Sequence, residues 1–236
     1  MSRQHIVFLS GAGVSAESGL ATFRGANGLW TNEEWQYLAS TDGLYYDTEK
    51  SLEFYNWRRK QLSEVNPNKA HLLIAGLEKD HQVTVITQNV DDLHEWAGSS
   101  HVIHLHGELR KVCSSKNRYD DNYVKDYPLD KPIRIGDDAG DGSQLRPYIV
   151  MFGEYVHGME KAQEIVNKAD VFVVVGTSLM VYPANNLILY AHKEIPKFVI
   201  DPNEIPKCEQ LGYEHIKDLA TNGMVSLYSR LKDMFG

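Results

Sequence analysis

Polar side chains that could do chemistry follow two apolar runs of the chain. Residues 88–92, directly after the apolar run 83–87, are mostly amides and carboxylates. A second run, 102–105, leads into His106, and the two-residue period of a strand places His104 on the same face as His106. A neutral imidazole can accept a proton, and amides and carboxylates can orient a polar ligand. These residues are therefore the first candidates for a functional site.

The same residues also have a purely structural interpretation. Asn89 could cap the next helix, with Asp91 in the first helical turn, where a carboxylate is favourable. A single histidine at the end of a strand is more often a hydrogen-bonded structural residue than a catalytic base. The residue types alone leave both interpretations open.

A glycine-rich segment follows the first apolar run, residues 6–9. Residues 11–16 satisfy the G-x-G-x-x-G/A pattern of a dinucleotide-binding turn. The absence of side chains at Gly11 and Gly13 would let backbone amides approach a pyrophosphate at the start of a helix. A tight turn that needs positive φ would produce the same pattern. The expected second strand with an acidic residue about twenty positions on is absent, so any dinucleotide would bind differently from in a standard dehydrogenase.

Six short apolar runs predict the buried strands that must position these residues. Helical stretches at 72–79, 159–168 and 184–193 lie between several of them, an alternation typical of parallel βαβ units. We therefore expect an α/β fold with a doubly wound, Rossmann-like parallel sheet, whose ligands bind beyond the carboxyl ends of the strands. The predicted strands are residues 6–9, 83–87, 102–105, 149–152, 171–175 and 198–200, and their polar ends are 10–13, 88–91, 106–107, 176–178 and 201–203.

Two segments interrupt the alternation of strands and helices. Residues 26–67 carry aromatic side chains and a predicted helix at 50–65, and residues 112–146 form a long excursion with weak periodicity. We expect both to form a small inserted module. The chain is then a single catalytic domain, 1–236, with its Rossmann-like core at approximately 1–25, 68–111 and 147–236.

Composition and charge disfavour several classes of function. The chain has 236 residues, 42% hydrophobic and 24% charged, which is typical of a globular domain with its own core. Its 24 basic and 32 acidic residues give a net charge of −8, which disfavours nucleic acid and anionic membranes as partners. Cys113 and Cys208 form no C-x-x-C pair, and no apolar run suits an export signal or a membrane span. We expect a cytoplasmic protein.

In combination, these motifs resemble those of the sirtuins, the NAD-dependent protein lysine deacylases, along nearly the whole chain. The glycine-rich segment as far as Phe23-Arg24 resembles the NAD-binding loop of the family, and residues 87–91 resemble its second signature. His106-Gly107 is similar to the motif of the catalytic histidine. Residues 146–154, 176–178 and 182–184 then follow in the order of the family's later signatures.

The resemblance implies a reaction and roles for individual residues. The acyl oxygen of an acylated lysine would attack the ribose carbon that bears nicotinamide, giving deacylated lysine, nicotinamide and 2'-O-acyl-ADP-ribose. Asn89 and Asp91 would position nicotinamide and ribose, and His106 would be the general base toward a ribose hydroxyl. The implied NAD-binding residues are Gly11, Ala12, Gly13, Ser15, Phe23, Arg24, Trp30, Gln88, Asn89, Asp91, Gly176, Thr177, Ser178, Asp201, Asn203 and Ala220.

The resemblance also implies where the acylated lysine of a protein substrate binds. Its peptide would add as a strand between residues 152–154 and Tyr182. Tyr55 and Arg58 lie three residues apart on a predicted helix and resemble the pair with which one sirtuin class recognises succinyl and malonyl groups. Without this context, such an arginine would most often pair with an acid on a solvated helix. The implied substrate residues are Tyr55, Arg58, Val150, Phe152, Gly153, Glu154 and Tyr182.

Two departures from the family pattern affect the expected site. Most sirtuins hold a structural zinc with two pairs of cysteines after the catalytic histidine, whereas Cys113 is the only cysteine in that segment here. One thiolate cannot form such a site, so we expect neither zinc nor another bound metal, and residues 112–146 should fold without metal or stay mobile. Asp201 stands where many members have asparagine, and its carboxylate can still accept from ribose hydroxyls.

Two other functions remain open at this point. A sirtuin-like enzyme could hydrolyse NAD or transfer ADP-ribose without deacylating protein, an alternative that the missing cysteines motivate. A metal-dependent hydrolase could instead use His94, His104, His106 and Asp91, a set of ligands that zinc or iron accepts. This last function would not account for the glycine-rich segment.

Overall fold

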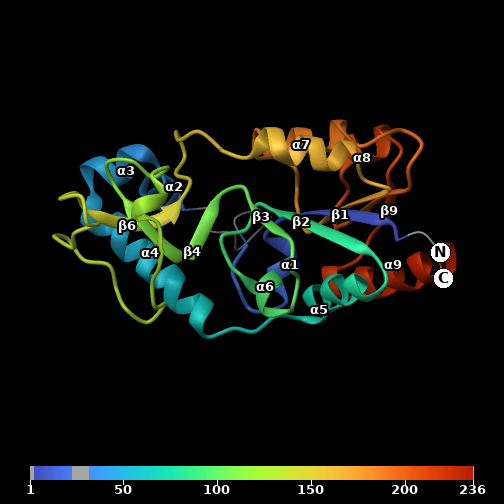
Figure 1. Cartoon of the computed structure of the whole chain (residues 1–236), viewed down its shortest axis with the longest axis horizontal. Coiled ribbons are helices and arrows are strands. Elements are labelled where there is room, and N and C mark those ends of the chain that lie inside the picture. The colour runs from blue at the N-terminus through green and yellow to red at the C-terminus, as the bar shows by residue number, and fades with distance from the viewer. Residues whose placement is uncertain (1–2, 23–31, 236) are drawn as a thin grey trace.

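The computed structural model describes residues 3–22 and 32–235, in which two sheets are surrounded by helices (Figure 1). The larger sheet has six strands in the order β3-β2-β1-β7-β8-β9, all parallel. The smaller sheet has three antiparallel strands in the order β5-β4-β6. The predicted α/β fold with a Rossmann-like parallel sheet is confirmed. The strands are β1 (His5–Ser10), β2 (Gln82–Thr87), β3 (Val102–His104), β4 (Gly107–Ser114), β5 (Lys125–Asp126), β6 (Leu145–Ile149), β7 (Val171–Val175), β8 (Lys197–Ile200) and β9 (Glu214–Ile216).

Helices cover both faces of the larger sheet because its strands are apolar on both sides. In β1, Val7 and Leu9 face one layer of helices and Ile6 and Phe8 face the other, and all four are fully buried. Helices α7 and α8 lie on the first face and α5 and α9 on the second (Figure 1). The helices of this part are α1 (Gly13–Ala16), α5 (Lys69–Gly76), η2 (Leu77–Lys79), α6 (Leu93–Trp96), α7 (Met159–Asn167), η4 (Ala184–Leu189), α8 (Pro206–Gln210) and α9 (Ala220–Phe235).

Two of the predicted elements differ from the structure. The strand predicted at 149–152 does not belong to the larger sheet, because β6 ends at Ile149 and pairs with β4 in the smaller one. The sixth parallel strand is β9, whose three residues include only one that is buried and are too few to stand out as an apolar run. The helix predicted at 184–193 is a 3-10 helix that ends at Leu189, consistent with the weak helix propensity of Asn185 and Asn186 in its first turn.

In the described residues, the small module consists of three α-helices, one 3-10 helix and the smaller sheet, at the end of the molecule opposite the two termini (Figure 1). Helix α2 begins after Asn32, whose Oδ1 accepts hydrogen bonds from the amides of Glu34 and Trp35. Arg59 of α4 is fully buried and donates to the carbonyls of Leu109, at 2.8 Å, and Pro128. This arginine therefore joins α4 to strand β4 and to the excursion. The helices are α2 (Glu33–Leu38), α3 (Thr41–Tyr46), α4 (Thr48–Ser63) and, in the excursion, η3 (Asp121–Tyr123).

The chain passes from the larger sheet to the smaller one through residues 105–106, between β3 and β4. Strand β4 begins before the predicted boundary at 111, and β6 begins before the one at 147, so both strands cross the predicted limits of the core. The division of the chain into core and module segments stays a prediction. No helix in the described ranges is long and apolar enough to cross a bilayer.

Candidate active site

A cavity of about 940 Å³ lies at the carboxyl edge of the larger sheet, where this edge meets the small module. Ser15 and Asp91 line a small second pocket that shares Arg58 and Asn89 with it. Phe23, Arg24 and Trp30, also predicted here, lie outside the described residues. The other predicted residues on the cavity wall are Gly11, Ala12, Gly13, Tyr55, Arg58, Gln88, Asn89, His106, Val150, Phe152, Gly153, Glu154, Gly176, Thr177, Ser178, Tyr182, Asp201, Asn203 and Ala220.

The glycine-rich segment packs closely against the end of β7. A Cβ on Gly11 would lie 2.6 Å from the Cβ of Thr177, and one on Gly13 would lie 2.7 Å from the Cα of Gly176. Both amides are already bonded, Gly11 to the Val175 carbonyl at 3.1 Å and Gly13 to the Gly176 carbonyl at 2.8 Å. These two amides are therefore committed within the protein, and neither glycine has a positive φ. The role of residues 11–13 in NAD binding stays a prediction. Close backbone packing explains both glycines.

Ser15 and Asn89 belong to a buried hydrogen-bond network. The side-chain amide of Asn89 donates to Ser15 Oγ at 3.1 Å, and its backbone amide donates to Thr87 Oγ1 at 3.0 Å. His71 Nδ1 accepts from the amide of Asn68, so its hydrogen lies on Nε2, which is 3.4 Å from Ser15 Oγ. Burial lowers the pKa of His71 to about 4, so this ring is neutral at pH 7. Sequence reasoning missed His71, whose one signal is the helix cap it forms with Asn68.

Asp91 is a carboxyl group that titrates near neutral pH. Its side chain is almost fully buried, and this burial raises its pKa to about 6. The amide of Leu93, which donates to Oδ1 at 3.3 Å, favours the ionised form, as do Ser15, His104 and Arg58. Above about pH 6 the carboxylate is therefore ionised and can accept hydrogen bonds from a ligand.

His106 lies on the cavity wall at the crossing between the two sheets. Its Nδ1 donates to the carbonyl of Gln88 at 2.9 Å, because a carbonyl can only accept, and Nε2 is then left without a hydrogen. Burial lowers the pKa of His106, against the effect of the bond to Gln88, so the ring is neutral at pH 7. Gly107 has a φ of +83°, and a side chain there would collide with the carbonyl of Tyr148. His106 is thus held in a form that can take a proton from a ligand hydroxyl.

The histidines near this edge do not converge on a metal position. His94 Nε2 is 3.0 Å from Ser10 Oγ, and both ring nitrogens of His104 are hydrogen-bonded within the protein. Within residues 3–22 and 32–235, no three or more His, Cys, Asp or Glu side chains are arranged to hold a metal ion. The alternative of a hydrolase with His94, His104, His106 and Asp91 as metal ligands is therefore wrong.

Hydrogen bonds between hydroxyl and carboxylate groups hold the excursion in place next to Cys113. Cys113 is fully buried in β4. The next residue, Ser114, donates from Oγ to Asp141 Oδ2 at 2.7 Å, and this Oγ lies 2.8 Å from Ser143 Oγ. One buried thiol beside two hydroxyls does not match the thiolate set of a structural zinc site. The residues present here therefore do not fit the zinc that the family implies.

The segment predicted to bind the peptide is already bonded on one side. The amide of Phe152 donates to the Ala39 carbonyl, and its carbonyl accepts from the Thr41 amide, both at 2.9 Å. The carboxylate of Glu154 lies 2.9 Å from a nitrogen of Arg146, so it anchors the segment. Because alternate residues of a strand face opposite edges, an added peptide would have to pair with residues next to Phe152.

Tyr55 and Arg58 both contribute to the cavity wall from α4, in keeping with their spacing. They are only 6% and 5% exposed. Burial raises the pKa of Tyr55. Burial also lowers the pKa of Arg58, and the negative charge of Asp91 opposes this second shift. Arg58 Nη1 donates to Gln61 Oε1 at 3.2 Å. Helix α4 therefore directs the guanidinium of Arg58 to the cavity, whereas the guanidinium of the next residue, Arg59, points into the protein.

These features define a class of protein: an α/β fold whose ligand cavity lies between the carboxyl edge of a parallel sheet and a small module. Residues 11–183 match the model of the Sir2 family. The chain is 49% identical over 225 residues to an NAD-dependent protein deacylase of Bacteroides thetaiotaomicron, covering 95% of this chain and 96% of the relative. It is 48% identical over 231 residues to one of Helicobacter pylori, covering 98% and 99%.

The solved structures agree with the sequence matches. A complex of a Sir2 homologue with NAD has a TM-score of 0.84 and 37% sequence identity, covering 98% of this chain and 91% of that one. The chain belongs to the Sir2 family, and the sirtuin resemblance of its motifs is confirmed.

Proposed function

We propose that this protein removes acyl groups from lysine side chains of proteins in an NAD-dependent reaction, and that it accepts succinyl and malonyl as well as acetyl groups. NAD-dependent deacylation rests on the family and on relatives of nearly equal length that carry this activity in their names. The choice of acidic acyl groups rests on one observation, the buried pair of Tyr55 and Arg58 on the same cavity wall as His106.

A terminal carboxylate on the acyl chain suits this part of the cavity. The planar guanidinium of Arg58 can donate two parallel hydrogen bonds to a carboxylate. Tyr55 stays protonated because burial raises its pKa, so its hydroxyl can donate to the same group. Hydrogen bonds to charged groups contribute about 1.5–3 kcal/mol. An acetyl group has no carboxylate and would gain none of this stabilisation.

The residues at the strand ends orient the reactants and move one proton. NAD supplies the ribose carbon that accepts the acyl oxygen when nicotinamide leaves. Asn89, held by Ser15 and Thr87, and the ionised Asp91 would position this region of the ligand. His106 would take a proton from a ribose hydroxyl at Nε2, because its Nδ1 is committed to Gln88.

The expected products, formed with the uptake of one water molecule that releases the lysine amine, are deacylated lysine, nicotinamide and 2'-O-acyl-ADP-ribose. A Sir2 homologue solved with 2'-O-acetyl-ADP-ribose supports the nucleotide product. It is 36% identical to this chain with a TM-score of 0.85, covering 98% of this chain and 93% of that one.

The test is incubation of the purified protein with NAD and peptides of one sequence that carry acetyl-, malonyl- or succinyl-lysine, followed by mass analysis of peptide and nucleotide. We expect loss of each acyl group from the peptide and its appearance on ADP-ribose, and no change in a matched reaction without NAD. Cleavage of NAD at one rate with or without acylated peptide would contradict deacylation. It would favour the alternative of a sirtuin-like NAD glycohydrolase or ADP-ribosyltransferase.

We also propose that the protein acts in the cytoplasm on acylated proteins, without nucleic acid, membrane or zinc as partners. Both cysteines are buried free thiols, which suits a reducing compartment, and the net charge of −8 disfavours anionic polymers and lipids. Cell fractionation of the tagged protein tests the location, and recovery in the membrane pellet would contradict it.

A further inference from the structure

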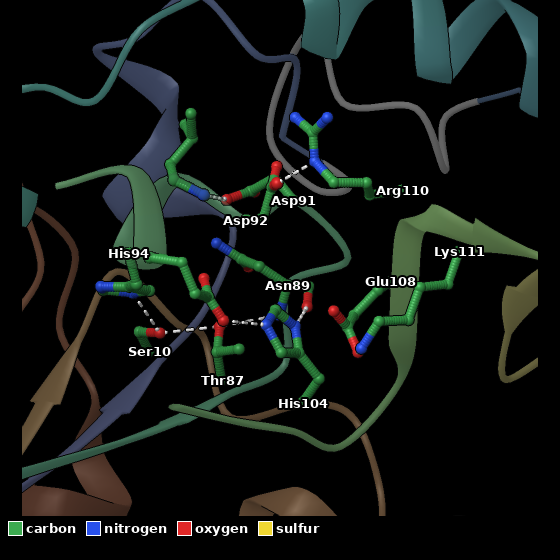
Figure 2. Close-up of polar contacts among 12 residues, drawn as sticks. Ser10, Thr87, Asn89, Asp91, Asp92, His94, His104, Glu108, Arg110 and Lys111 are labelled. Atoms are coloured by element: carbon green, nitrogen blue, oxygen red, sulfur yellow. Dashed lines mark hydrogen bonds and ion pairs between the residues drawn. The ribbon is translucent and has the colours of Figure 1, made fainter. Parts of the chain in front are cut away.

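A half-buried ion pair lies beside residues 88–92 and has no part in the reaction described above (Figure 2). His104 is the last residue of β3, and its side chain is 7% exposed. Its Nε2 lies 2.7 Å from Oε1 of Glu95 on α6. Its Nδ1 lies 3.1 Å from the carbonyl oxygen of Asn89, and Figure 2 shows the ring beside this residue.

Both ring nitrogens of His104 face oxygens that accept hydrogen bonds. A carbonyl has no hydrogen to donate, and neither has an ionised carboxylate. A neutral imidazole has a single N–H and would leave one of the two contacts without a hydrogen. The geometry is satisfied when both nitrogens are protonated, that is, when a charged ring is paired with an ionised Glu95.

The surrounding charges favour this state of the pair. Burial lowers the pKa of His104, but the hydrogen bond and charge of Glu95 outweigh it, so that the pKa is raised. Glu108 of β4 also raises it, and Lys111 of β4, bonded to Glu108 at 2.8 Å, helps to keep Glu95 ionised. By contrast, burial lowers the pKa of the neighbouring His94 well below its usual value, so that ring is neutral.

We propose that His104 is a positioning residue of the deacylase, whose charged ring fixes the carbonyl of Asn89 and stabilises the negative charge of Asp91. The proposal rests on the proposed function for its catalytic meaning. Asn89 is then held at three points, its carbonyl by His104 at 3.1 Å, its amide by Thr87 at 3.0 Å and its side chain by Ser15 at 3.1 Å. Asp91 faces cations on two elements, His104 of β3 and Arg58 of α4, besides the Ser15 hydroxyl.

The experiment compares wild type with His104→Gln and Glu95→Gln. Glutamine in place of His104 can still donate one hydrogen bond but has no charge, and Glu95→Gln removes the counter-ion. Both should lower kcat roughly ten- to a hundredfold with little change in KM for NAD, since Asn89 is misplaced. The acid limb of the pH profile should move up by about one pH unit, because Asp91 loses a cation. His5→Gln, a half-buried histidine at the opposite end of β1, is the control and should change neither quantity.

Two NMR measurements test the same proposal independently of enzyme activity. In ¹⁵N-histidine-labelled protein at pH 6.5, the signal lost in His104→Gln should show a ring that is mostly protonated at both nitrogens, and a mostly neutral ring would overturn the proposal. The ¹³C titration of the Asp91 carboxyl should also move up by about one pH unit in His104→Gln, and an unmoved titration would show a merely structural His104. An inactive wild type with these expected spectra would overturn the proposed function and not the state of the pair.

Discussion

The carboxyl edge of the larger sheet and the small module contribute to one cavity with different kinds of groups. At the edge, Asn89 and His106 are fixed by hydrogen bonds of about 3 Å to neighbouring strands and turns. The module contributes Tyr55 and Arg58 from one helix, which Arg59 anchors on its other side. We infer that the edge serves the steps common to every acyl group, whereas the module selects among acyl groups. Substitutions at the edge should therefore affect all substrates alike, and those in the module should not.

The largest effect is expected from His106→Ala at the edge. Loss of the general base should lower kcat/KM on acetyl and succinyl peptides alike by about a hundredfold to ten-thousandfold. Binding of NAD, measured by calorimetry, should be retained because the ring is one of many groups on the cavity wall. Near-normal turnover of either peptide would remove His106 from the reaction.

The pH dependence should also be common to all acyl groups. Asp91 acts when ionised and its pKa is about 6, whereas His106 acts when neutral and its pKa lies below the usual value. Protonation of either group removes the active form, so kcat/KM should fall at least roughly tenfold per pH unit below the pKa of Asp91. Rates between pH 5 and 8 on folded protein test this, and a profile that stays flat to pH 5 would exclude Asp91.

A smaller and selective effect is expected from Tyr55→Phe in the module. The change removes one hydroxyl donor and keeps the buried ring, so it should lower kcat/KM on a succinyl peptide by about three- to tenfold. The acetyl peptide of the same sequence should change less than about twofold, since it offers no carboxylate. A larger loss on the acetyl peptide would show that Tyr55 serves packing or the common steps.

The smallest effect on activity is expected from a substitution in the excursion, which lies far along the chain from α4. Ser114→Ala should lower the free energy of unfolding by about 1–2 kcal/mol, because the Ser114 hydroxyl is bonded to Asp141 and packed beside Ser143. Thermal unfolding of wild type and Ser114→Ala measures this loss of stability.

The wild type should carry no stoichiometric zinc and should melt at one temperature with or without chelator. Elemental analysis measures the zinc content, and a bound equivalent of zinc would contradict this account of the excursion.

Much of the larger sheet and the location of the site were predictable from the sequence. Strands β1, β2, β7 and β8 are buried on both faces, so they read as unbroken apolar runs, and the polar residues after them are where ligands bind in such folds. Strand β9 has only three residues and was not predictable in this way.

Contacts between distant residues explain what sequence reasoning missed. The purpose of Gly11 and Gly13 depends on the backbone of Gly176, more than 150 positions along the chain. Ser15 meets His71 only once the sheet has formed, and the charge of His104 depends on Glu95 from another element. Local residue patterns contain no information on such partners, so the protonation states of the site required the structure.

The most direct test of the division between edge and module is the ratio of kcat/KM on succinyl and acetyl peptides of one sequence, for wild type and Arg58→Met, measured at pH 8, where Asp91 stays ionised without Arg58. Loss of a charge-assisted hydrogen bond worth about 1.5–3 kcal/mol should lower the succinyl value roughly ten- to over a hundredfold, and the acetyl value far less. Arg58→Lys keeps the charge without the planar donor pair, so its kcat/KM on the succinyl peptide should lie between the values of wild type and Arg58→Met. An equal loss on both peptides would contradict the account, because Arg58 would then be structural and the module would not select the acyl group.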